Sequence, residues 1–159
     1  MRNLKRALSL ALASVMVMGL MVVGTGASYA DVSSEQNQEA IEVLQAVGVM
    51  TGDENGNFNP DANVTRNEMA VVMSNLLDYT VSSYKGTAPF SDVPSWAEPY
   101  VAACYTNGII AGYDAKTFGP NDKVTGYQAL AMILRAIGYD KNGEFTGSGW
   151  QVQTAAVGK

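Results

Sequence analysis

Apolar residues recur at helical spacing in four separate stretches of this 159-residue chain. Apolar residues at i, i+3, i+4 and i+7 share one face of an amphipathic helix, which can turn toward a core. The stripes are Ala40, Val43, Leu44 and Val47; Met69, Val72, Met73, Leu76 and Leu77; Trp96, Tyr100, Ala103 and Cys104; and Ala129, Met132, Ile133, Ala136 and Ile137. The pattern predicts an all-α fold.

Residues that satisfy free backbone groups mark the expected helix boundaries. Gly48 and Gly108 follow the first and third stripes, where glycine can adopt the left-handed conformation that caps a helix C-terminus. Before the second and fourth stripes, a threonine is followed three positions later by Glu or Gln, which predicts a capping box. These pairs are Thr65 with Glu68 and Thr125 with Gln128. Each pair of stripes therefore predicts a helix–loop–helix unit.

The two units repeat the same order of residues, 60 positions apart. Identities fall at Gly48/Gly108, Gly52/Gly112, Phe58/Phe118, Pro60/Pro120, Val64/Val124, Thr65/Thr125 and Tyr79/Tyr139. A period of this size indicates supersecondary units that bury their faces against one another. We expect units at 31–79 and 90–139, a linker at 80–89, and a linker with the start of an incomplete third unit at 140–159. Together they would pack as a pseudo-symmetric helical bundle.

The first thirty residues are typical of a secretory signal peptide. Three basic residues occur within the first six positions, residues 7–23 carry no charge, and a small-residue stretch ends in Ser28-Tyr29-Ala30. We expect a signal at 1–30, with cleavage after Ala30. A retained membrane anchor is the alternative, because an apolar run of about 17–25 residues can span a bilayer.

Charge and composition narrow the classes of function. The expected mature chain keeps seven basic and fifteen acidic residues, a net charge of −8, which disfavours nucleic acid as a partner. Histidine is absent from the sequence, which excludes Ser-His-Asp and Cys-His catalysis and most catalytic zinc sites. The single cysteine excludes an internal disulfide. Cys104 takes the place of Leu44 in the repeat, so we expect it to be a small buried residue.

Two other chemistries fit the residues poorly. The loop from Asp53 to Asn57 imitates the start of an EF-hand, but Phe58 stands where glycine is required and Val64 where a bidentate carboxylate is required. Glycoside hydrolysis needs two matched carboxylates. The acidic residues are instead scattered over expected loops and exposed helix faces, so we expect no catalytic pair.

The helix that begins after Thr65 is a candidate anion site. A helix N-terminus presents free N–H groups and a partial positive charge. Arg66 adds a fork of donors that can bind a carboxylate in bidentate fashion. The alternative is a surface arginine paired with Glu68 or Asp61. Gly126 replaces the arginine in the second unit, so a site there should be weaker or differently built.

An ordered string of short motifs resembles the S-layer homology motif. The second unit carries Phe90-Ser91-Asp92-Val93, Trp96-Ala97, Gly108-Ile109-Ile110-Ala111-Gly112, Phe118-Gly119-Pro120 and Val124-Thr125. The first unit carries Asp31-Val32, Gly48-Val49-Met50-Thr51-Gly52, Phe58-Asn59-Pro60 and Val64-Thr65-Arg66-Asn67-Glu68, without the tryptophan. Family domains commonly arrange three motifs around a pseudo-threefold axis, with ligand grooves between motifs. Trp150 would correspond to Trp96 at the start of a third motif.

The resemblance implies a non-catalytic anchor at the bacterial surface, without a cofactor or a metal. Family domains bind secondary cell-wall polysaccharide, often bearing pyruvylated sugars, or a peptidoglycan-linked glycan. The residues placed at the glycan are Arg66, Thr65, Glu68, Asp92, Trp96, Gly112, Thr125 and Gln128. For two of them we favour another role, since Trp96 would suit the core and Asp92 would suit a helix cap.

Two related functions stay open. Tyrosines are frequent along the mature chain and could support self-association into a surface layer. Alternatively, the segment could tether an enzyme domain that follows Lys159.

Overall fold

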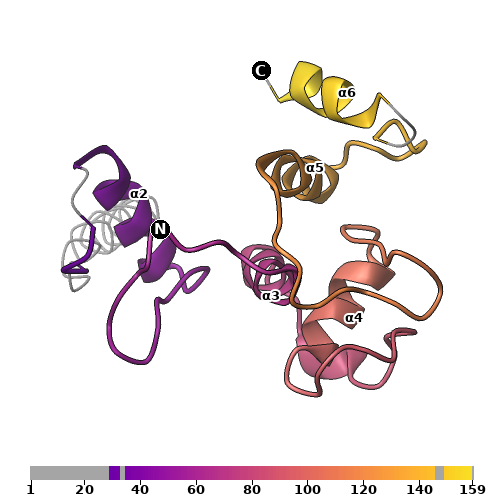
Figure 1. Cartoon of the computed structure of the whole chain (residues 1–159), viewed down its shortest axis with the longest axis horizontal. Coiled ribbons are helices and arrows are strands. Elements are labelled where there is room, and N and C mark those ends of the chain that lie inside the picture. Colours follow the sequence, from indigo (N-terminus) through magenta and orange to yellow (C-terminus); the bar gives the residue numbers. More distant parts are fainter. Residues whose placement is uncertain (1–28, 33–34, 146–148, 159) are drawn as a thin grey trace, which may run out of the picture. The chain divides into compact units, whose positions relative to one another are not determined.

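The computed structural model describes residues 29–32, 35–145 and 149–158 (Figure 1). Its α-helices are α2 (Glu35–Ala46), α3 (Arg66–Leu76), α4 (Glu98–Thr106), α5 (Gly126–Ala136) and α6 (Trp150–Val157), with a short 3₁₀ helix, η1 (Val81–Tyr84). The described residues contain no β-strand, only an isolated bridge between Thr65 and Lys123. The predicted all-α fold is confirmed.

Most of the expected export signal lies outside the described residues, which begin at Tyr29. In the part of the chain that the structure describes, none of the helices combines the length and the apolar character needed to cross a bilayer.

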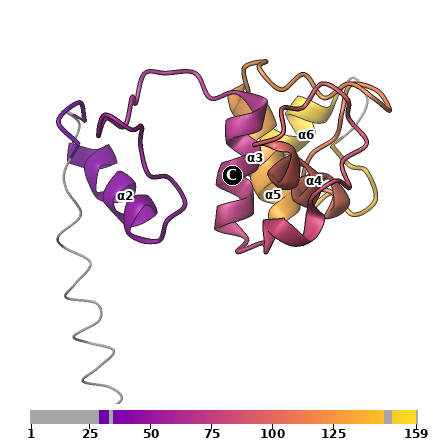
Figure 2. The same cartoon turned by 90° about the horizontal axis from the view of Figure 1, so that it is seen from below.

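Contacts divide the chain into two compact units, residues 1–60 and 61–159. The first contains α2 and the loop that follows it, whereas the second contains α3, η1, α4, α5 and α6. Within the second unit, α3 packs against α4 and α5 packs against α6 (Figure 2). The second helix of one sequence repeat is therefore paired with the first helix of the next.

The helix boundaries follow the local chemistry of the sequence. Glu68 N donates to Thr65 Oγ1 at 3.3 Å, and the Glu68 carboxylate accepts the Thr65 N–H at 2.7 Å. Thr125 and Gln128 form the same reciprocal pair, at 3.3 and 2.8 Å. Both predicted capping boxes are thus confirmed. Gly108 has a φ of +72°, and the following residues bond back to the end of α4, as expected of a glycine cap.

The main core of the second unit lies between α3, α4 and the loop that follows α4. Met73, Val101 and Phe118 are completely buried there. Cys104 is also completely buried, and its sulfur lies 3.3 Å from Ser74 Oγ. Burial raises the pKa of the thiol, so Cys104 is the inert core residue that the repeat predicted.

Parts of the predicted apolar stripes are exposed. Among the α2 residues whose burial is described, Ile41 is buried, whereas Ala40 and Val43 are exposed; Val47 is largely exposed. In the second unit, Leu76, Ile133 and Ile137 are likewise exposed. The predicted burial of these residues is wrong, because a stripe is buried only where another element covers it.

Trp96 is 58% exposed, so its expected place in the core is also wrong. The physical reason is the register of α4, which begins at Glu98 rather than at the tryptophan. Ala97 is completely buried instead.

Candidate functional site

Arg66, the first residue of α3, is buried and joins two segments of the second repeat. It is only 6% exposed. Nε donates to the Phe118 carbonyl at 2.9 Å, and Nη2 donates to the Ala111 carbonyl at 2.6 Å. The guanidinium carbon lies 4.3 Å from the Phe118 ring centroid and 4.9 Å from that of Tyr113, within the range of cation–π contacts. Arg66 therefore holds the start of α3 to the loop after α4.

The charge of Arg66 forms no ion pair with any described residue. Burial lowers the pKa of Arg66, and the nearby Tyr113, Asp122 and Asp92 partly offset that effect. An arginine nevertheless remains protonated, and two carbonyl bonds use only part of its five N–H donors. The guanidinium is thus held by two carbonyls and two aromatic rings, and no described carboxylate lies within ion-pair distance of it.

The expected alternative partners of Arg66 do not bind it. The Glu68 carboxylate is engaged by the backbone N–H and hydroxyl of Thr65, at 2.7 and 2.8 Å. Neither Glu68 nor Asp61 forms an ion pair with Arg66 in the described structure. The alternative, a surface arginine paired with Glu68 or Asp61, is therefore wrong.

The N-terminus of α3 is not the free anion site that the sequence suggested. The Arg66 N–H donates to the Asp122 carbonyl at 2.9 Å, and the Asn67 N–H donates to the Pro120 carbonyl at 3.1 Å. The Glu68 N–H is taken by Thr65. Because these N–H groups bond to the protein, they are not free to bind an anion.

A cavity of about 170 Å³ lies beside Arg66 within the second unit. One wall comes from α5, where Gln128, Met132 and Arg135 share a face at i, i+4 and i+7. The other walls come from the start of α3, the segment after α4, Phe145 and the start of α6. The lining residues are Arg66, Ile110, Ala111, Gln128, Ala131, Met132, Arg135, Phe145 and Trp150.

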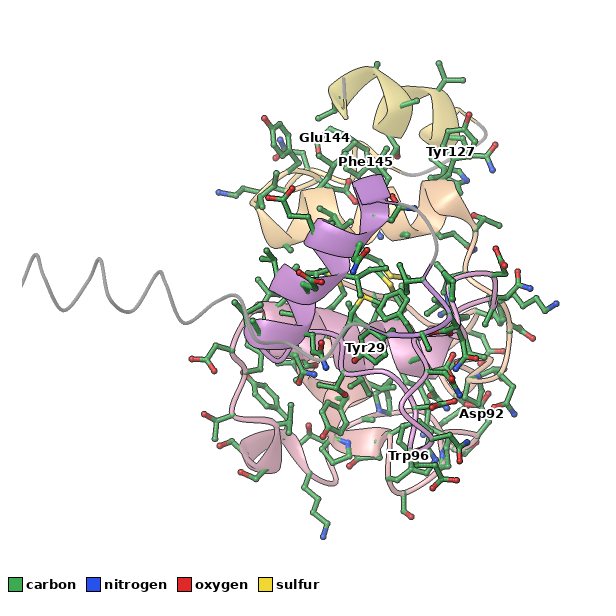
Figure 3. The ribbon with its side chains drawn as sticks, turned by 90° about the vertical axis from the view of Figure 1, so that its left-hand side faces the viewer. Tyr29, Asp92, Trp96, Tyr127, Glu144 and Phe145 are labelled. Carbon is green, nitrogen blue, oxygen red and sulfur yellow. The ribbon has the colours of Figure 1, made fainter. Side chains whose placement is uncertain are left out.

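A second guanidinium on this cavity is neutralised by a carboxylate. Arg135 Nε donates to Asp140 Oδ2 at 2.6 Å, and Asp140 Oδ1 accepts the Phe145 N–H at 2.7 Å. Asp140 therefore positions both Arg135 and the buried Phe145. Phe145 is labelled in Figure 3. Arg66, which has no ion pair among the described residues, thus lines this cavity together with Arg135, Gln128 and Trp150.

Of the residues placed at a glycan by resemblance, Arg66 and Gln128 line this cavity together. Gln128 uses its amide oxygen for the Thr125 N–H, so its NH₂ group is the part that can donate to a ligand. Thr65, Glu68 and Thr125 form the capping boxes and do not line the cavity.

The other three residues lie elsewhere in the second repeat. Asp92 neither caps α4 nor lines the cavity; its carboxylate accepts the N–H groups of Phe118 and Gly119, each at 2.9 Å (Figure 3). The expected capping role is therefore wrong. Partial desolvation raises the pKa of Asp92. The hydrogen bonds from the Gly119 and Phe118 N–H groups together lower it by more, so the pKa lies below its ordinary value. Gly112 leaves room for the ring of Phe90, and Trp96 is exposed outside the cavity.

The sequence analysis did not single out Arg135, which lines the cavity. A signal was present, because Arg135 follows Gln128 by seven positions and so shares its face of α5. The contribution of Ala111 and Phe145 had no such signal, since only the tertiary structure brings their segments to the start of α3.

In the loop that resembles the start of an EF-hand, the Asp53 carboxylate accepts hydrogen bonds from residues of the same loop. Asp53 Oδ1 accepts the N–H groups of Asn55 and Asn57 at 2.9 and 2.8 Å, and Oδ2 accepts the Asn59 amide at 2.9 Å. These bonds, led by the one from Asn57, lower the pKa of Asp53 to about 2. Asp53 thus organises its own loop by accepting N–H groups.

Comparison with known proteins agrees with the geometry of the repeats. The chain matches the S-layer homology domain family over residues 28–70 and 89–130. It is 33% identical, over 69% of its length, to a surface-layer 125 kDa protein of Lysinibacillus sphaericus, covering 9% of that protein. It is 30% identical, over 89% of its length, to an endoglucanase of a Bacillus strain, covering 16% of it. A cell surface protein of Thermoanaerobacter kivui is 29% identical over 87% of the chain, which covers 19% of that protein.

The chain thus spans less than a fifth of the length of these curated relatives. Domains of the matched family anchor exported proteins to the cell wall. Two family matches, at the two repeats seen in the sequence, cover more than half of the chain. The chain belongs to the S-layer homology domain family and is a secreted, cell-wall-associated protein.

Proposed function

We propose that this chain is a non-catalytic module that binds an acidic cell-wall polysaccharide and tethers an exported protein to the bacterial surface. The ligand is a glycan that carries a carboxylate, such as a pyruvylated secondary cell-wall polysaccharide. The binding site is the cavity beside Arg66. Membership of the S-layer homology family supports the anchoring role, and the composition of the cavity supports the acidic ligand.

The buried, unpaired guanidinium of Arg66 carries the proposal. Removing a charge from water is costly unless another charge or several hydrogen bonds replace the lost hydration. Two carbonyls and the rings of Tyr113 and Phe118 replace part of it, and no described carboxylate forms an ion pair with the guanidinium. A carboxylate from a glycan would supply the missing charge and accept the remaining N–H donors.

The rest of the cavity suits a sugar. The Gln128 amide can donate to a ring hydroxyl, and Trp150, which packs partly buried against the cluster of Ala131, Leu134 and Phe145, adds apolar surface to the cavity wall. The cavity is small, so we expect one acidic residue of the glycan to enter it. Affinity would then depend on several modest contacts acting together along the polymer.

Co-sedimentation of the exported chain with wall sacculi tests this proposal. Three preparations are compared: intact sacculi, sacculi treated with mild acid to hydrolyse pyruvyl ketals, and sacculi stripped of secondary polysaccharide. We expect binding to intact sacculi only. Binding that survives the loss of the ketals would refute the acidic ligand, and binding that survives stripping would refute the polysaccharide.

The variant for this assay is Arg135→Gln, because Arg66 also holds the fold together. Arg135→Gln leaves the Asp140 carboxylate without its partner beside the cavity, and its repulsion should weaken the binding of an acidic glycan by about tenfold, which corresponds to about 1.4 kcal/mol. Lys85→Gln is the matched control, since it makes the same charge change at an exposed residue away from the cavity. Equal loss in both variants would indicate non-specific attraction.

A tethered enzyme is a second possibility for the whole protein, because one of the relatives is an endoglucanase. The chain itself would still act as the anchor. Assembly into a surface layer is the other possibility, favoured by the surface-layer relatives. Light scattering of the folded chain, with and without solubilised polysaccharide, would distinguish anchoring by a monomer from self-assembly.

A further inference from the structure

Tyr29 is a core residue of the first compact unit. Tyr29, which is labelled in Figure 3, is 6% exposed. Its ring centroid lies 5.5 Å from that of Phe58. The backbone of Gly52 approaches the same ring so closely that a Cβ there would lie 2.7 Å from Tyr29 Cε1. Glycine at position 52 therefore makes room for Tyr29 as well as for a positive φ of 71°.

The second repeat contains the same arrangement around Phe90. Phe90 is 7% exposed, and its ring centroid lies 5.4 Å from that of Phe118. Gly112 makes room for the Phe90 ring as Gly52 does for Tyr29. Each unit thus begins with an aromatic residue that packs beside the phenylalanine of its loop.

The aspartate two positions after each aromatic residue confirms the equivalence. Asp31 accepts the N–H groups of Phe58 and Asn59 at 3.0 and 2.6 Å. Asp92 accepts the N–H groups of Phe118 and Gly119 in the same way. The segments 29–32 and 90–93 are therefore structurally equivalent, and the family match accordingly starts at residue 28.

Cleavage after Ala30 would conflict with this arrangement. It would remove Tyr29 from the first unit, leave Phe58 without its aromatic neighbour, and open a cavity beside Gly52. It would also make Asp31 the N-terminal residue, so that the segment orienting its carboxylate toward Phe58 and Asn59 would be lost.

We propose that the export signal ends before Tyr29, and that the mature protein keeps Tyr29, Ala30 and Asp31 as the opening segment of its first repeat. The sequence offers a second small-residue site, Thr25-Gly26-Ala27, immediately upstream. Signal peptidase would hydrolyse the Ala27–Ser28 peptide bond. Water adds its OH to the Ala27 carbonyl carbon, and a proton goes to the released amine of Ser28.

The hydroxyl of Tyr29 provides a matched control. It is buried and has no hydrogen-bond partner in the described structure, and Phe90 fills the equivalent place without a hydroxyl. Tyr29→Phe should therefore keep or improve the packing, whereas Tyr29→Ala should lose it. If Tyr29 were merely the end of a leader, neither variant would affect the folded protein.

The experiment is to export the full-length chain from a bacterial host and determine the N-terminus of the mature protein by sequencing and intact mass. We expect it to begin at Ser28. A mature chain that begins at Asp31, or one that keeps the whole leader, would overturn the proposed cleavage.

Amide exchange of Phe58 and Asn59 in the same exported material tests the structural reason. Protection should fall at least about tenfold in Tyr29→Ala and stay the same or rise in Tyr29→Phe. A Tyr29→Ala protein that is too unstable to recover, beside a normal Tyr29→Phe protein, would also support the core role. Equal protection in all three proteins would overturn it.

Discussion

Replacing Arg66 with alanine should release the loop after α4 from the start of α3. The side chain makes two charge-assisted hydrogen bonds, to the Phe118 and Ala111 carbonyls at 2.9 and 2.6 Å. Such bonds contribute about 1.5–3 kcal/mol each. Both carbonyls belong to segments more than forty positions away in the sequence, so nothing local would replace the lost contacts.

The net effect is smaller than the sum of the two bonds. Burying a guanidinium costs several kcal/mol, and that cost disappears with the side chain. Two carbonyls would lose their donor, at about 1–3 kcal/mol for each one that water cannot reach. We therefore expect Arg66→Ala to lower the free energy of unfolding by about 2–4 kcal/mol. Arg66→Lys keeps the charge but not the fork of donors, and should lose about half as much.

Urea unfolding of the whole chain, followed by tryptophan fluorescence, measures the loss, because Trp96 and Trp150 both lie in the second unit. Lys85→Ala is the control and should change the free energy of unfolding by less than about 0.5 kcal/mol. An Arg66→Ala protein as stable as this control would refute the structural role of the guanidinium. It would also make Arg66 a clean binding variant for the sacculus assay.

Three further changes test the loops and the core. Asp92→Asn should lower the free energy of unfolding by about 1–2 kcal/mol, because a neutral amide oxygen accepts the Phe118 and Gly119 N–H groups less strongly. Asp92→Glu should not restore the lost stability, since the longer side chain misplaces the carboxylate. Phe118→Ala should cost about 3–5 kcal/mol in the same urea assay, since the ring is completely buried, and a loss below about 1 kcal/mol would contradict that placement. Acid should destabilise the first loop, because hydrogen bonds lower the pKa of Asp31 and bring that of Asp53 to about 2. Their stabilisation is present above the unfolded pKa near 3.8 and is lost as the pH falls toward about 2; NMR titration of both carboxyls checks this, and ordinary pKa values would refute it.

Features governed by neighbouring residues could be predicted from the sequence. The capping boxes join residues three positions apart, so they can be recognised from the sequence without knowledge of the tertiary structure. The burial of Cys104 was also predictable, because the repeat assigns it the position of an apolar residue and no polar role competes. The glycan-binding role of Arg66 stays a prediction, whereas its burial and its two carbonyl partners were not foreseen.

Features governed by distant residues could not be predicted in this way. Trp96 lies on the expected stripe, but the start of α4 at Glu98 leaves its ring exposed. The sequence also gives no sign that Asp92 bonds to residues 118 and 119, because the two segments meet only when the loop folds back.

The sequence by itself determined the helices, their caps, the repeat and the acidic, histidine-free composition, since these depend on residue type and short spacing. Only the tertiary structure decided that α3 pairs with α4 and α5 with α6, so that helix pairs join consecutive repeats. It also decided that Arg66 is buried without an ion pair to any described carboxylate, and that Tyr29 belongs to the folded domain. The physical reason is that the charge and shape of a side chain follow from its residue type. Its burial and its partners depend instead on segments that are distant in the sequence and meet only in the folded chain.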